Sequence, residues 1–171
     1  MNEAETGAAR LRRLLAEVRA DRTVLVTRGD EIARLAADAS ALLSSRERVA
    51  ALALALDRTY TVLESILERV ARSLEGGLPT GADWHRTLLH NAQLDIPDVR
   101  PAILTHDVVD TADQLRRFRH FLRHAYAAEL DADRLKRLAD NWRRVWQALQ
   151  SDLDGFERFL DGLAIELDAQ R

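Results

Sequence analysis

Apolar residues recur at helical spacing along most of the chain, and no segment shows the alternation that is typical of a strand. The first such pattern predicts a helix over residues 3–43, which Gly29-Asp30 can kink or briefly break. A second helix is expected to begin at a capping box formed by Ser44 and Glu47. It ends at Gly76-Gly77, where the apolar stripe stops and helix-terminating residues follow.

All three prolines lie between positions 79 and 101, which marks this stretch as a connector. It contains a short predicted helix near 84–93, and two long helices follow, near 106–128 and from about 131 to 167. Polar residues that can cap the three helices precede them: Asp83, Thr105 and Asp131. The last helix has apolar residues every seven positions: Leu135, Trp142, Leu149, Phe156 and Leu163. We therefore predict an all-α fold, a four- to five-helix up-and-down bundle over residues 1–171 as one domain, whose heptads also permit a homodimer.

Composition narrows the function classes. The net charge of −3 means that any contact with nucleic acid must come from a local basic patch. The absence of cysteine excludes disulfides, thiolate metal sites and thiol catalysis. No apolar run long enough for a membrane span and no leader-like segment is visible, so we expect a cytoplasmic protein without membrane contact.

A local basic patch lies on the predicted helix 106–128. Four arginines and two histidines share one face, opposite an apolar face: Arg116, Arg117, Arg119, Arg123, His120 and His124. No acidic residue lies between Asp113 and Glu129 to neutralise the patch. Arginine stabilises phosphate charge and histidine exchanges protons near neutrality, so these are groups that can cleave RNA without a metal. A basic helix face is, however, more often simply solvated.

At about 100° per residue, Arg119 and His124 lie about 140° apart on this helix. They converge on one phosphate only if the substrate bridges across the helix, if a local distortion turns one residue, or if a symmetric partner helix completes the site.

The spacing Arg119-x4-His124-x-Tyr126 resembles the signature of the HepT-like branch of the HEPN ribonucleases. His120 fills the position after the arginine, where that family carries a polar residue. The segments Gly76-Gly77-Leu78-Pro79 and Trp84-His85-Arg86 also resemble HepT-like proteins. Together with the helical layout, the likeness extends over most of the chain.

This resemblance implies a homodimeric toxin that cuts RNA without a metal or other cofactor, with two motif helices facing each other. It also implies an antitoxin partner, a minimal nucleotidyltransferase of the MntA type, which silences the toxin by transferring AMP onto Tyr126. In such an endoribonuclease, His124 serves as general base or acid and Arg119 stabilises the phosphorane. His120 supports them, while Arg116, Arg117 and Arg123 hold the RNA backbone.

Other interpretations stay open. An inactive HEPN dimer that binds nucleotide, RNA or a nucleotidyltransferase partner would carry the same motif. His120 and His124, four residues apart, could instead hold a metal, although the sequence offers no clear third ligand. Trp84 could stack on bases, whereas Trp142 and Trp146 lie on the heptad stripe and fit the core or a dimer contact. Tyr60 lies on an apolar stripe and is interpreted as structural.

Overall fold

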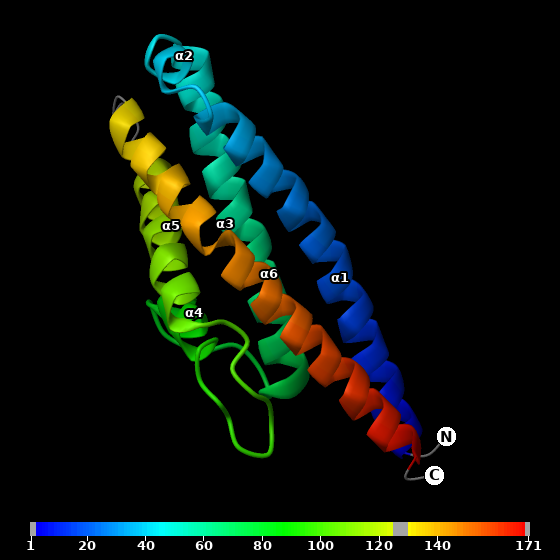
Figure 1. Cartoon of the computed structure of the whole chain (residues 1–171). Helices are drawn as coiled ribbons and strands as arrows, with labels where there is room; N and C mark the ends of the chain where they lie inside the picture. Colours follow the sequence, from blue (N-terminus) through cyan, green and yellow to red (C-terminus); the bar gives the residue numbers. More distant parts are fainter. Residues whose placement is uncertain (1–2, 125–129, 170–171) are drawn as a thin grey trace.

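The computed structural model describes residues 3–124 and 130–169, and six helices account for most of them (Figure 1). The only strand-like feature in these ranges is an isolated bridge between Ile96 and Arg100. The all-α prediction is therefore confirmed. The helices are α1 (Glu3–Ala36), α2 (Ala39–Leu43), α3 (Arg46–Leu74), α4 (Trp84–Asn91), α5 (His106–His124) and α6 (Ala132–Ala169).

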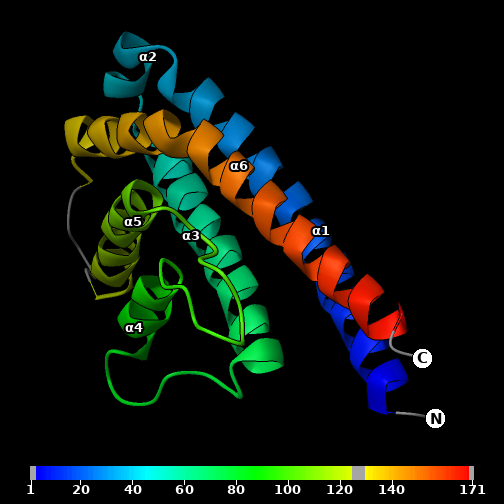
Figure 2. The ribbon, with the colours of Figure 1, turned by 60° about the horizontal axis from the view of Figure 1, so that its bottom comes forward.

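The four long helices alternate in direction, as expected for an up-and-down bundle. α1 packs along both α6 and α3, and α5 packs against α6, α3 and α4. Ion pairs connect α1 to both neighbours, through Arg22 and Asp154 on α6 and through Asp21 and Arg69 on α3. In both views the start of α1 lies beside the end of α6, with α2 at the opposite end of the bundle (Figures 1 and 2).

One continuous hydrophobic core holds the bundle together, because each long helix turns its apolar stripe inward. Its largest fully buried side chains include Trp142, Tyr60 and Phe156. Trp142 is therefore a core residue, as its place on the heptad stripe predicts. Trp146, one turn later, is only half-buried and packs on α1.

Two predicted helix boundaries are wrong. The helix predicted over 3–43 ends at Ala36, and residues 39–43 form the separate short helix α2; α1 runs without a break through Gly29. At Gly29 a Cβ atom would lie 2.5 Å from Cη2 of Trp146, so the glycine admits the indole ring. Ser45, not Ser44, caps α3, because its hydroxyl accepts a hydrogen bond from the Arg48 amide at 3.3 Å.

The connector between α3 and α5 is held by Arg100, which is only 4% exposed. Its guanidinium donates to the Glu75 carboxylate at 2.6 Å and to three backbone carbonyls of the connector. Gly76 and Gly77 turn the chain away from α3 with positive φ angles of 79° and 146°. This arrangement seats α4 against α3 and α5 (Figures 1 and 2).

Candidate active site

A groove of about 220 Å³ lies where α3, α4 and α5 meet. α5 contributes most of its lining, α3 contributes two residues and α4 one: Arg116, Arg119, His120, Arg123, His124, Tyr60, Glu64 and His85. Five of the side chains predicted to act in catalysis or RNA binding therefore share one hollow. Arg119 and His124 both line it, although they lie on well-separated angles of the helix.

Arg119 is the most deeply held cation of the groove, with a side chain that is 15% exposed. Its guanidinium donates a hydrogen bond to the hydroxyl of Thr61 on α3. Two carboxylates of the same helix lie at the limit of ion pairing, Asp57 at 3.9 Å and Glu64 at 4.0 Å. These contacts hold a fixed positive charge at the wall of the groove without neutralising it by a close bidentate pair.

The imidazole rings of His120 and His124 pack against each other at a tilt of 35° near the end of α5. Their ring centroids are 4.3 Å apart, and both side chains are exposed. The Nδ1 atom of His124 lies 2.7 Å from the backbone carbonyl of His120. Because a carbonyl only accepts hydrogen bonds, Nδ1 carries the proton and Nε2 is the nitrogen that can take one up in the neutral ring.

A carboxylate–histidine pair faces these residues across the groove, and the sequence interpretation did not identify it. The Nδ1 atom of His85 lies 2.6 Å from Oε1 of Glu64, whose side chain is only 6% exposed. Since a carboxylate accepts the Nδ1 proton, Nε2 of His85 is again available for proton transfer. Trp84 stacks on the same imidazole at 3.6 Å between ring centroids and so restricts its orientation.

Tyr60 completes the buried side of this cluster. Burial raises the pKa of its phenol above the ordinary value, and the negative charge and hydrogen bond of Glu64 raise it further. The phenol therefore stays protonated at neutral pH and serves as a donor to the carboxylate. Its interpretation as purely structural is incomplete, because the side chain both fills the core and supports Glu64.

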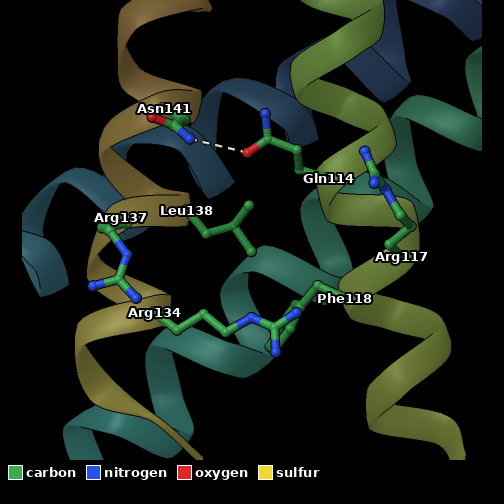
Figure 3. A pocket seen from close by; sticks show the side chains of 7 residues that line it. All are labelled: Gln114, Arg117, Phe118, Arg134, Arg137, Leu138 and Asn141. Carbon is green, nitrogen blue, oxygen red and sulfur yellow. Dashed lines mark hydrogen bonds between the residues drawn. The ribbon is translucent and has the colours of Figure 1, made fainter.

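The predicted RNA-binding arginines do not form one unpaired patch. Asp113 accepts from Arg116 at 2.6 Å and from Arg117 at 3.0 Å, so this carboxylate at the edge of the patch neutralises part of it. Arg116 and Arg123 line the groove, but Arg117 turns to a different cavity between α5 and α6 (Figure 3). Arg123 is exposed at the rim.

Tyr126, the predicted modification site, lies outside the described residues. Within those residues, no group of three histidine, aspartate or glutamate side chains is arranged to hold a metal ion. His120 and His124 thus lack a third ligand from the described part of the chain. No helix over 3–124 or 130–169 is both long enough and apolar enough to cross a bilayer.

The chain matches a known protein family. The family described as HepT-like protein matches residues 51–160, which is well over half of the chain and includes α4, α5 and the groove. Searches of curated proteins and of solved structures gave no match.

Proposed function

The chain belongs to the HepT-like family, and on that basis and from the groove beside α5 we propose that it is a metal-independent endoribonuclease, the toxin of a toxin–antitoxin pair. The observation that carries the proposal is the composition of the groove. It combines a fixed guanidinium, that of Arg119, with imidazoles contributed by two different helices. Those groups suffice for cleavage of an RNA phosphodiester by the neighbouring ribose 2′-hydroxyl.

In the proposed reaction, the ribose 2′-oxygen attacks the adjacent phosphorus while its proton passes to Nε2 of one histidine. The bond from phosphorus to the 5′-oxygen breaks, and that oxygen takes a proton from a second, protonated histidine. The products are a 2′,3′-cyclic phosphate and a 5′-hydroxyl. No water, metal or redox partner enters this step.

His124 is one of the two proton-transfer groups in this account. His85 is suited to be the other, because Glu64 holds its Nδ1 proton and stabilises the imidazolium that forms. His120 positions His124 through its backbone carbonyl and the contact between the two rings. Arg119 donates to the phosphorane oxygens, where charge-assisted hydrogen bonds strengthen as negative charge develops.

The proposed partners follow from family membership and sequence position. The toxin acts as a homodimer in the cytoplasm, and its antitoxin is a nucleotidyltransferase of the MntA type. AMP on Tyr126, two residues after His124, would bring bulk and negative charge beside the arginines that hold the RNA backbone. RNA held by Arg116, Arg117 and Arg123 would then be repelled.

The test is cleavage of a structured RNA in EDTA by unmodified protein and by single variants. Arg119→Ala and His124→Ala are expected to lose about 100-fold or more of the rate, and His85→Ala a comparable amount. His106→Ala is the matched control, because His106 is exposed at the opposite end of α5 and does not line the groove. RNA binding without cleavage by the wild type would support the inactive binding protein instead.

A further inference from the structure

A second hollow, larger than the groove with the histidines, lies on another flank of α5. It is formed between α5 and the first turns of α6 and has a volume of about 450 Å³. That volume is in the range of pockets that take a ligand the size of a nucleotide. Nothing in the proposed cleavage step uses this cavity, apart from Arg117 at its edge.

Three guanidinium groups surround the cavity, Arg117 from α5 and Arg134 and Arg137 from α6. Arg117 is paired with Asp113, but Arg134 and Arg137 have no carboxylate partner among the described residues. Both are exposed. In Figure 3 the Arg134 side chain reaches across one end of the cavity toward α5. Arg134 also lies over the Phe121 ring, with its guanidinium carbon 5.8 Å from the ring centroid. Two guanidiniums without a carboxylate partner beside one hollow favour a phosphate, which they can bind with charge-assisted hydrogen bonds.

The rest of the lining suits the remainder of a nucleotide. Phe118 and Leu138 are 6% and 8% exposed and give the cavity an apolar floor. The side chains of Gln114 and Asn141 close the opposite end with a hydrogen bond of 2.9 Å (Figure 3). Each amide keeps further donor or acceptor capacity, which a base edge can use. An apolar floor with amides and arginines at the rim is a combination that binds single-stranded RNA.

The cavity and the catalytic groove are separated by α5 alone. Arg116 and Arg119 line the groove, whereas Gln114, Arg117 and Phe118 of the same helix line the cavity. A helix with its side chains is only about 10–12 Å across. A strand whose scissile phosphate lies in the groove can therefore cross α5 and place a neighbouring nucleotide in the cavity.

We infer that the α5–α6 cavity is a second RNA subsite, which binds a nucleotide flanking the scissile bond and holds its phosphate with Arg134 and Arg137. This inference rests on the proposed ribonuclease function, because that function places the scissile phosphate of the strand in the groove. It also gives Arg117 a defined place, because this arginine lines the α5–α6 cavity rather than the catalytic groove.

The first test measures binding of a uniformly 2′-O-methylated oligoribonucleotide, which cannot be cleaved, by fluorescence anisotropy at several salt concentrations. Arg134→Ala/Arg137→Ala is expected to weaken binding by roughly tenfold or more. Loss of this phosphate contact should also reduce the slope of log affinity against log salt by about 0.7. The matched control is Arg143→Ala/Arg158→Ala, which removes the same charge from exposed positions of α6 outside the cavity.

Equal losses in the two double variants, or no loss in either, would overturn the subsite. A second contradicting result concerns free AMP. If AMP binds the wild type more tightly than the oligonucleotide does, and Arg134→Ala/Arg137→Ala abolishes AMP binding, the cavity serves a free nucleotide and not RNA. A wild type that cleaves no RNA while the two variants still differ in binding would overturn the proposed function and leave the RNA subsite standing.

The second test asks whether the subsite flanks the cleaved bond. A dinucleoside monophosphate has only the scissile phosphate and none for Arg134 and Arg137 to hold, so wild type and Arg134→Ala/Arg137→Ala should cleave it with the same kcat/KM. With a longer oligonucleotide the variant should show a raised KM and an unchanged kcat. A loss that is equal for both substrates would contradict the inference and indicate a general effect on the fold.

Discussion

Replacing Arg100 is expected to be among the most destabilising single changes in the connector that carries α4. The side chain is 1% exposed and donates to Glu75 at 2.6 Å, to the carbonyls of Leu94 at 2.9 Å and Pro101 at 3.0 Å, and to that of Asn91 at 3.0 Å. Arg100→Met keeps an apolar stem of similar length but removes every donor. It leaves a largely buried carboxylate without a counter-ion and three carbonyls without a partner.

Breaking a buried ion pair in this way costs about 3–5 kcal/mol, because one charge stays behind without compensation. Domains of this kind are stable by only about 5–15 kcal/mol, so the change should be large in urea unfolding followed by circular dichroism. Arg86→Met is the matched control, since Arg86 is exposed in the same region and its loss should change stability by no more than about 0.5 kcal/mol. Adding Glu75→Gln to Arg100→Met should restore part of the loss.

The reasoning would be refuted if Arg100→Met lost less than about 1 kcal/mol and matched Arg86→Met. It would also be refuted if Glu75→Gln made the double variant less stable than Arg100→Met alone, because the uncompensated carboxylate would then not be the source of the cost.

Three further predictions test other contacts. Gly29→Ala should lower the free energy of unfolding by up to about 2 kcal/mol despite the better helix propensity of alanine, because its Cβ would lie 2.5 Å from an indole ring of α6. Gly162→Ala is the control, because its Cβ would meet nothing within 4 Å, and it should stabilise the fold by about 0.5–1 kcal/mol. Equal losses of stability in Gly29→Ala and Gly162→Ala would contradict this account. The native state holds the Tyr60 proton more tightly than the unfolded chain, so the free energy of unfolding should fall as pH rises above about 10. A Tyr60→Phe variant that shows the same decline between pH 9 and 11 would argue against this. Asp152→Ala removes the acceptor of two hydrogen bonds from Thr105, so amide exchange in the first turn of α5 should accelerate there and not in α3.

The helical periodicity was sufficient to predict the architecture, because each long helix buries one apolar stripe in a single core. Local features were less well determined. Ser44 and Ser45 are adjacent, and only the hydrogen bond to the Arg48 amide distinguishes the cap. Gly29 could equally have broken a helix or admitted a neighbour, and the sequence alone does not say that an indole ring packs there.

The α5 half of the candidate site could be predicted because its residues share one helix, whose geometry sets their order around the axis. The other half could not, because Glu64 and His85 come from two helices joined by the glycine- and proline-containing connector. One signal was present in the sequence: Glu64 follows Tyr60 by one helical turn and sits beside Leu63 on an otherwise apolar stripe. A charge in that position needs a buried partner.

The helical wheel was also insufficient to assign Arg117. It gives the angle of a side chain around α5, but the packing of α6 decides which hollow that angle faces. For the same reason the 140° separation of Arg119 and His124 did not prevent both from lining one groove, since α3 and α4 form its other walls.

The central claim is that this protein cleaves RNA without a metal, by attack of the RNA's own 2′-hydroxyl on the adjacent phosphate. The most direct test is to incubate unmodified protein in EDTA with an RNA and with DNA of the same sequence, and to identify the product ends by mass spectrometry. The account predicts that RNA alone is cut, leaving 2′,3′-cyclic phosphate and 5′-hydroxyl ends, and that His124→Ala abolishes the cut while His106→Ala does not. Cleavage of the DNA, 5′-phosphate ends, or activity that returns only with added divalent metal would contradict it.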